Sequence, residues 1–261
     1  MKISSTLDLA KISNKIKKIL SPGDAVFLYG QIGVGKTTFA LDIARALNCQ
    51  SDDLMLVPCG DCRQCKRILS LVHTDVFLYD VQPSKANSDV LSQIVTIDSL
   101  RDDFISQVYK KPFEGRARVF IISAVEKMRS EQANVILKTL EEPPDDTVII
   151  LLSEQVDGII ETIVSRCQSI ALNSAHNGLV EKYIKEYWPD FEAYSSTELA
   201  RLSKGRLGWI YNAVTDQNIM VSRSELLNIY EDMVSNNIDS RLDVSSKLVE
   251  RFQKSNDSGK E

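Results

Sequence analysis

The sequence has no long hydrophobic run and no excess of positive charge, and each absence excludes a class of protein. No stretch of 18 or more apolar residues occurs, so a membrane-spanning helix is not expected, and the N-terminus lacks the pattern of a signal peptide. A net charge of -5 argues against coating nucleic acid through bulk charge, which needs a basic face. Repeats and low-complexity tracts are also absent. Because 43% of the residues are hydrophobic, we expect a globular cytoplasmic protein with a substantial core.

Residues 30–37 form a glycine-rich motif, GQIGVGKT, that fits the phosphate-loop pattern G-x-x-x-x-G-K-[ST]. An apolar run at 25–29 precedes it, and apolar residues spaced as on one helix face follow it from Phe39 to Leu47. This strand-loop-helix context lets backbone N–H groups and a helix N-terminus face one anion. We expect Lys36 to reach nucleotide phosphates and Thr37 to bind Mg2+. The predicted nucleotide-binding residues are Gly30, Gly33, Gly35, Lys36, Thr37 and Thr38; the alternative is a turn that binds nothing.

Four of the five cysteines are clustered just after the phosphate-loop helix. Cys49, Cys59, Cys62 and Cys65 have the spacing C-x9-C-x2-C-x2-C. In a reducing compartment this clustering favours a metal over disulfides, and four thiolates fit a tetrahedral structural Zn2+ site. We predict a zinc knuckle at residues 49–65, with a redox pair or chance clustering as the alternatives. The fifth, Cys167, is expected to be a small core residue.

Three further apolar runs, at 76–79, 119–122 and 148–152, are continuous and not alternating, which is typical of strands buried on both faces. Helical patterns separate them, at 97–108 and at 133–140. Alternating strands and helices predict an α/β fold with a parallel sheet. After about residue 173 the strand signal ends. We expect a nucleotide-binding domain at 1–172, a small all-helical lid at 173–215, a short helical segment at 216–253 and a polar tail at 254–261.

Two more strings complete a recognisable order of motifs. LKTLEEPP occupies residues 137–144, and Ser165-Arg166-Cys167 follows. Together with the phosphate loop and the cysteines, they resemble the bacterial DNA polymerase III clamp loader, an AAA+ assembly, over residues 23–215; the strings at 73–75, 97–101 and 133–134 add to the match. The resemblance implies an AAA+ domain with a parallel five-stranded sheet, a helical lid and a helical collar domain. It also implies partners: gamma/tau and delta subunits, the sliding clamp and primer-template DNA.

The chain departs from an ATP-hydrolysing member of that family at several positions. Ser123 and Ala124 stand where Asp-Glu would hold magnesium and polarise water, and the nearest carboxylate, Glu126, is expected to be an ordinary exposed acid on the next helix. Gly208 stands where the lid would place an arginine, for which Arg206 is a substitute. The sensor position at the end of the next strand falls on Ser153 or Glu154.

These departures resemble the delta-prime type of clamp-loader subunit. The resemblance implies that Arg166 is an arginine finger that reaches the ATP site of a neighbouring subunit in trans; the alternative is a structural ion pair. We expect a subunit of a DNA-directed DNA polymerase (nucleotidyltransferase) complex that binds ATP or ADP with Mg2+ and hydrolyses it poorly or not at all. About 45 residues follow the lid, fewer than a full collar of this family, so the collar is expected to be reduced or shared.

Other functions remain open. One is a gamma-type ATPase motor subunit, and another is a scaffold that does not respond to nucleotide. A third is a free-standing P-loop ATPase, because residues 22–39 are similar to the ATPase of bacterial threonylcarbamoyl-adenosine tRNA modification. Two basic clusters, Lys15, Lys17 and Lys18 and then Lys110, Lys111, Arg116 and Arg118, are expected to be solvated surface, with DNA contact as the alternative.

Overall fold

The computed structural model describes residues 23–53, 57–80, 94–128, 130–156, 159–191 and 194–235. The chain divides into two compact units, residues 1–208 and 209–261. The domain boundaries expected at 172 and 215 remain predictions. The basic cluster at 15–18, residues 236–253 of the predicted helical segment 216–253, and the tail 254–261 lie outside the described residues.

A parallel sheet forms the centre of the first unit, as the apolar runs predict. Its order is β3-β2-β4-β5-β1-β6, and every neighbouring pair runs parallel. The strands are β1 (Ala25–Tyr29), β2 (Val76–Asp80), β3 (Ile94–Thr96), β4 (Arg118–Ser123), β5 (Thr147–Ser153) and β6 (Gln168–Ala171). The α/β fold is confirmed. Six strands are described, whereas the family resemblance implied five. The apolar runs correspond to β1, β2, β4 and β5, and the short edge strands β3 and β6 carry no long apolar run.

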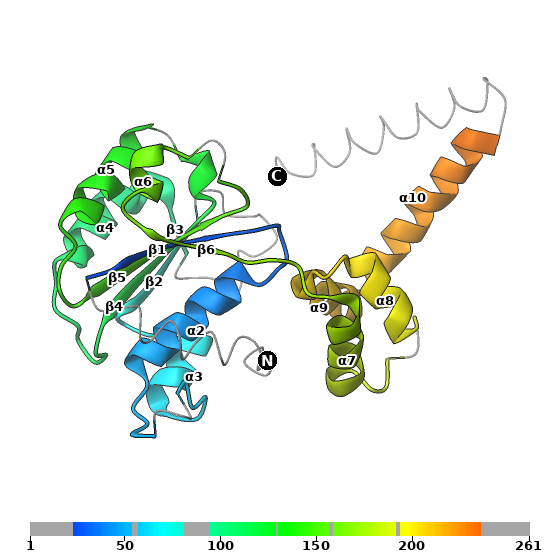
Figure 1. Ribbon diagram of the computed structural model, residues 1–261, viewed down its shortest axis with the longest axis horizontal. Coiled ribbons are helices and arrows are strands. Elements are labelled where there is room, and N and C mark those ends of the chain that lie inside the picture. Colours follow the sequence, from blue (N-terminus) through cyan, green and yellow to red (C-terminus); the bar gives the residue numbers. More distant parts are fainter. Residues whose placement is uncertain are drawn as a thin grey trace. The chain divides into compact units, whose positions relative to one another are not determined.

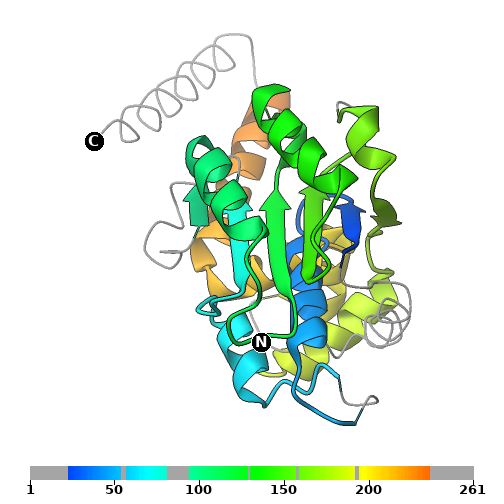
Figure 2. The same ribbon diagram turned by 90° about the vertical axis from the view of Figure 1, so that its left-hand side faces the viewer.

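Helices cover both faces of this sheet, which explains why its central strands are apolar throughout. α2 (Lys36–Asn48) and α3 (Arg63–Leu69) lie on one face, opposite α4 (Ile97–Val108), α5 (Ser130–Glu141) and α6 (Glu161–Val164) (Figures 1 and 2). Alternate residues of each strand enter different cores: Val26 packs with Phe39 of α2, and Phe27 packs with the cluster that contains Phe104 of α4. Because parallel strands end at one edge, the residues after β1, β4 and β5 are neighbours.

After β6, the described residues contain helices and no strand. They are α7 (Asn177–Tyr187), α8 (Ser196–Ser203), α9 (Leu207–Thr215) and α10 (Gln217–Ser235). α7 and α8 bury Val180, Ile184 and Leu199, and Ser195 caps α8 by accepting a hydrogen bond from the Glu198 N–H at 3.2 Å. In the described part of the chain, no helix combines the length and apolar character needed to cross a bilayer.

Candidate functional site

The phosphate loop joins β1 to α2, as its flanking patterns predict. Gly35 is the residue before the helix and has φ +101°, in the left-handed region that favours glycine. Gly30 is required for a different reason, since a Cβ at this position would lie 2.2 Å from the Leu172 carbonyl oxygen. The 13-residue helix α2 therefore begins directly at the loop and directs its N-terminal N–H groups toward the space in front of it.

Lys36 occupies the inside of this loop. Its Nζ donates to the carbonyl oxygens of Gly30 at 2.7 Å and Gln31 at 3.1 Å. Burial lowers the pKa of Lys36, and the nearby carboxylates of Glu154 and Glu126 oppose that shift. The six residues expected to bind nucleotide thus come together at the start of α2, with Thr37 exposed and Thr38 partly buried. The donors and the lysine fit a nucleotide phosphate with its metal ion.

The residues after β4 and β5 lie beside the loop, and one of them was misjudged from the sequence. Ser123 donates its hydroxyl to the Tyr79 carbonyl oxygen at 3.1 Å. Ala124 has φ +55° and leads into a short 3-10 turn, η4 (Val125–Lys127). Within this turn, Glu126 Oε2 lies 2.7 Å from Ser153 Oγ. The expectation that Glu126 is an ordinary exposed acid is wrong, because the turn places it, half-buried, against the end of β5.

Gly208, a residue of the lid predicted from the sequence, contacts the phosphate loop through its backbone. Its N–H donates to the Gly33 carbonyl oxygen at 2.8 Å, and a Cβ at this position would lie 3.1 Å from the same oxygen. A larger residue would therefore have to displace one of the two segments. Arg206, the substitute expected from the sequence, donates its Nε to the Ser203 carbonyl oxygen at 2.9 Å, which lies within the lid.

The fold brings the side chains of the four clustered cysteines close together. The sulfurs of Cys49, Cys59, Cys62 and Cys65 all lie within 4.8 Å of one another. Cys49 directly follows α2, and Cys62 is the N-cap of α3. Zn–S bonds of about 2.3 Å place the sulfurs of a tetrahedral site roughly 3.8 Å apart. The cluster is therefore close to the geometry that one metal ion needs.

Backbone N–H groups donate hydrogen bonds to the sulfurs of Cys49, Cys59 and Cys62, whereas burial raises the pKa of Cys65 to about 12. The Cys59 N–H donates to Cys49 Sγ at 3.5 Å, the Cys62 N–H to Cys59 Sγ at 3.3 Å and the Cys65 N–H to Cys62 Sγ at 3.4 Å. Although burial opposes it, hydrogen bonds from the backbone lower the pKa of Cys62 to about 6. Deprotonated sulfur is the form that binds a metal.

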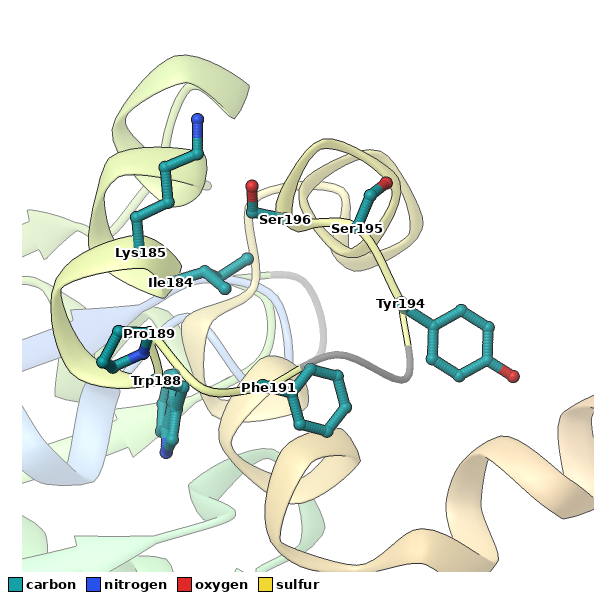
Figure 3. A pocket seen from close by; sticks show the side chains of 8 residues that line it. All are labelled: Ile184, Lys185, Trp188, Pro189, Phe191, Tyr194, Ser195 and Ser196. Atoms are coloured by element: carbon teal, nitrogen blue, oxygen red, sulfur yellow. The ribbon is translucent and has the colours of Figure 1, made fainter.

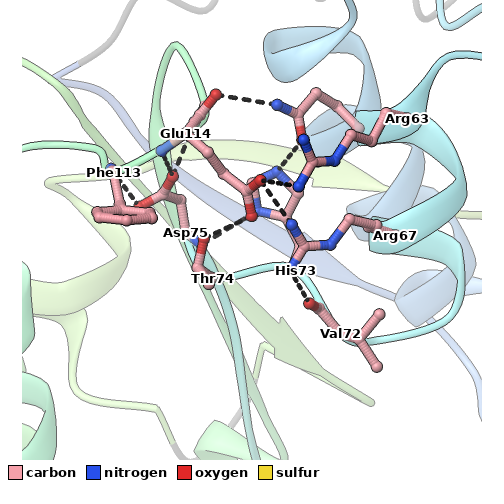
Figure 4. Close-up of polar contacts among 10 residues, drawn as sticks. Arg63, Arg67, Val72, His73, Thr74, Asp75, Phe113 and Glu114 are labelled. Carbon is pink, nitrogen blue, oxygen red and sulfur yellow. Dashed lines mark hydrogen bonds and ion pairs between the residues drawn. The ribbon is translucent and has the colours of Figure 1, made fainter.

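A polar network ties the segment that follows the cysteine cluster, α3 and residues 72–75, to the sheet (Figure 4). Asp75, at the start of β2, accepts hydrogen bonds from the backbone N–H groups of Phe113, Glu114 and Gly115, each at 2.8 Å. Glu114 in turn accepts from Arg67 of α3 at 2.6 Å. The other bonds join Gln64 to the Glu114 carbonyl at 2.9 Å, His73 Nε2 to Gln64 at 2.9 Å and Thr74 to the Glu114 carboxylate at 2.6 Å. The string at 73–75, noted only as a family resemblance, therefore has a structural role.

Arg166 lies near the LKTLEEPP string, although 25 residues separate it from Glu141. Its Nη2 donates to Glu141 Oε1 at 3.0 Å, and its Nη1 donates to the Thr162 carbonyl oxygen at 3.0 Å. The side chains are 36% and 54% exposed, so the pair is accessible. Burial raises the pKa of the neighbouring Cys167 to about 12, which agrees with the expectation of a core residue and not a nucleophile.

Arg118 does not belong to the exposed basic cluster in which the sequence placed it. Its side chain is only 6% exposed. The guanidinium lies 5.0 Å from the centroid of the Phe77 ring and donates to the Gln107 carbonyl oxygen at 2.8 Å. Lys110, Lys111 and Arg116 are exposed. The surface cluster is thus smaller than expected.

A concavity of about 450 Å³, which was not predicted from the sequence, lies beside α7 and α8 (Figure 3). It is lined by Ile184, Lys185, Trp188, Pro189, Phe191, Tyr194, Ser195 and Ser196.

Comparison with known proteins agrees with the motifs. A family model described as DNA polymerase III, delta subunit, matches residues 9–176. DNA polymerase III subunit delta' of Bacillus subtilis is 32% identical over 211 residues, 79% of this chain and 58% of that protein. The subunit delta' of Pseudomonas aeruginosa is 33% identical over 183 residues, 69% of this chain and 52% of that protein. This chain thus spans somewhat more than half the length of these relatives.

A related subunit and a solved structure extend the comparison. DNA polymerase III subunit gamma of Buchnera aphidicola subsp. Acyrthosiphon pisum is 32% identical over 161 residues, 62% of this chain and 41% of that protein. The crystal structure of a DNA polymerase III gamma subunit-related protein from Thermotoga maritima has a TM-score of 0.51 at 20% identity, covering 94% of this chain and 72% of that one, which supports the AAA+ fold. The chain belongs to the DNA polymerase III clamp-loader family, in which its relatives include delta-prime subunits.

Proposed function

We propose that this chain is a delta-prime-type subunit that helps load the sliding clamp onto primed DNA and supplies Arg166 to the ATP site of a neighbouring subunit. The observation that carries the proposal is the accessible guanidinium of Arg166 after α6, held by Glu141 and the Thr162 carbonyl. These two acceptors orient the arginine and leave part of it exposed. A cation offered in this way stabilises charge that develops on a transferred phosphoryl group.

The chain's own phosphate loop is proposed to bind ATP or ADP with Mg2+ and to turn it over poorly or not at all. Gly30, Gly35 and Lys36 have the conformations and contacts of a phosphate cradle. Bound Mg2+ would neutralise phosphate charge, with Thr37 as its ligand. Ser123 and Ala124 have no carboxylate with which to polarise water, which supports weak turnover.

The cysteine cluster is proposed to hold one structural Zn2+ through Cys49, Cys59, Cys62 and Cys65. Four sulfurs with no remaining position for a substrate are typical of a structural site. The N–H groups directed at the sulfurs support this assignment, because such bonds orient thiolate ligands. The role of the ion would be to fix α2 against α3.

A gamma-type motor subunit is the second candidate, because gamma subunits are also among the relatives and the phosphate loop is intact. The residues after β4 argue against it, since Ser123 uses its hydroxyl on the Tyr79 carbonyl. The partners of either candidate would be gamma/tau and delta subunits, the sliding clamp and primer-template DNA.

The ATPase activity of a reconstituted loader tests the proposal. With Arg166→Ala, we expect DNA- and clamp-stimulated turnover to fall at least tenfold, a conservative bound because arginine fingers contribute about 10³- to 10⁵-fold. The complex should still assemble by size-exclusion chromatography. Arg201→Ala removes an exposed arginine from α8 and is the matched control. Unchanged turnover with Arg166→Ala, or failure of the wild-type chain to join the complex, would contradict the trans role.

A further inference from the structure

We propose that Glu126 is the carboxylate that holds the metal ion of the nucleotide in this chain's own phosphate loop, replacing the aspartate that is missing after β4. The inference rests on the proposed nucleotide binding and adds a residue to that site. Sequence spacing hides it, because Glu126 comes three residues after Ser123, the position at which the family places the carboxylate.

A short series of contacts connects Glu126 to the phosphate loop. Glu126 Oε2 lies 2.7 Å from Ser153 Oγ. Ser153 is paired with Tyr29 at the end of β1, and its carbonyl oxygen accepts the Gly30 N–H at 3.2 Å. The Gly30 carbonyl oxygen in turn accepts from Lys36 Nζ at 2.7 Å. The Ser153 hydroxyl also lies 2.6 Å from the Gln155 carbonyl oxygen, so its single proton serves two acceptors. The Glu126 carboxylate therefore contacts the residue that directly supports the first glycine of the loop.

The backbone after β4 explains how a late residue reaches this place. β5 lies between β4 and β1 in the sheet, and the Ser123 side chain turns the other way, toward the Tyr79 carbonyl of β2. The left-handed conformation of Ala124 starts a tight turn, and Val125 is buried in the core below it. The turn thus places Glu126 over the end of β5.

The carboxylate retains the capacity to bind a cation. Oε2 lies at the Ser153 hydroxyl, whereas Oε1 has no hydrogen-bond partner within the described residues. Magnesium in nucleotide sites is bound by one or two carboxylates together with phosphates and waters. Glu126 has one carboxylate oxygen without a hydrogen-bond partner among the described residues, a contact from its other oxygen to Ser153, and a half-buried position next to the phosphate cradle. These are properties required of such a ligand.

Glu154 is the other carboxylate near Lys36, and its surroundings differ from those of Glu126. It is exposed, and within the described ranges no hydrogen bond holds its side chain, whereas Glu126 is oriented by Ser153. Both carboxylates act electrostatically on Lys36. If these carboxylates influenced nucleotide binding only through their charge, both Glu126 and Glu154 would contribute. If a carboxylate binds the metal ion, binding should depend mainly on Glu126.

Equilibrium binding of a fluorescent ATP analogue to the full chain, in Mg2+ and in EDTA, separates these roles. We expect Mg2+ to tighten binding to the wild type about tenfold, and Glu126→Gln to reduce this gain to less than about threefold while affinity in EDTA is kept or improved. Glu154→Gln is the matched control and should retain most of the gain. Lys36→Ala should lose binding under both conditions.

A second measurement observes the metal directly. With Mn2+ in place of Mg2+, the bound-ion signal in electron paramagnetic resonance should require ATP and should weaken with Glu126→Gln but not with Glu154→Gln. Thermal unfolding of each variant verifies that it is folded. A full Mg2+ gain with Glu126→Gln, or its loss with Glu154→Gln alone, overturns the inference while nucleotide binding stands. No binding by the wild type in either condition overturns both proposals.

Discussion

At the scale of single residues, Gly30 shows how closely the phosphate loop is fitted to its surroundings. The space where a Cβ would lie is occupied by the Leu172 carbonyl at 2.2 Å. This carbonyl belongs to the backbone that follows β6, so a flexible side chain cannot move aside to make room. The loop glycine is thus needed for packing as well as for its contact with Lys36.

We predict that Gly30→Ala lowers the free energy of unfolding by about 2–4 kcal/mol, because backbone must move to relieve the clash. Gly23→Ala is the matched control: Gly23 also has positive φ, at +96°, but nothing lies within 4 Å of its added Cβ. The Gly23→Ala change should lower the free energy of unfolding by only about 1 kcal/mol, because it introduces backbone strain without a clash. Urea denaturation measures both, and equal losses would show that the Leu172 contact is unimportant.

At the scale of elements, a few buried polar groups hold together α3, β2 and the loop before β4. Burial opposes ionisation of Asp75, yet three backbone N–H groups and the Arg118 guanidinium, 3.8 Å away, keep the pKa of Asp75 below its ordinary value. A carboxyl with a lowered folded pKa contributes stability above its unfolded pKa, and that stability is lost as pH falls through the folded pKa.

Accordingly, Asp75→Asn should destabilise the protein by about 2–3 kcal/mol at pH 7, because an amide accepts fewer and weaker hydrogen bonds than a carboxylate. The difference from the wild type should shrink as pH falls below about 4, the unfolded value. Chemical denaturation at several pH values measures this dependence. Asp145→Asn, at an exposed position, is the control and should change stability by less than about 0.5 kcal/mol. A pH-independent loss at Asp75 would assign the effect to packing.

For the cysteine cluster, native purification followed by elemental analysis should yield about one zinc per chain. Cys62→Ser should reduce the metal content severalfold and lower the melting temperature, because a structural site loses affinity with each ligand. Cys167→Ala removes a thiol outside the cluster and should leave the metal content unchanged. Metal-free wild-type protein, or equal metal content in the two variants, would argue for a different role of these cysteines.

At the scale of the whole molecule, predictability from the sequence depends on how local each feature is. The phosphate loop and the cysteines were predictable, because their chemistry lies in closely spaced residues whose flanks indicate strand and helix. Edge strand β6 was not predictable, since its partly exposed residues QSIA form no apolar run. Glu126 was misjudged because its position depends on the left-handed turn at Ala124. Arg118 was misplaced because only the fold brings Asp75, Phe77 and Gln107 around it.

Helix α2 has a consequence for communication within the molecule. Its first residue is Lys36 of the phosphate loop, and the residue after its last is Cys49 of the metal cluster. A helix of 13 residues spans about 20 Å and behaves as a stiff rod. A ligand that fixes one end of α2 would also limit the thermal tilting of its other end. By thermodynamic reciprocity, any effect of an ion at the cysteine end on the affinity for an anion at the glycine end would be matched by an equal effect of the anion on the affinity for the ion.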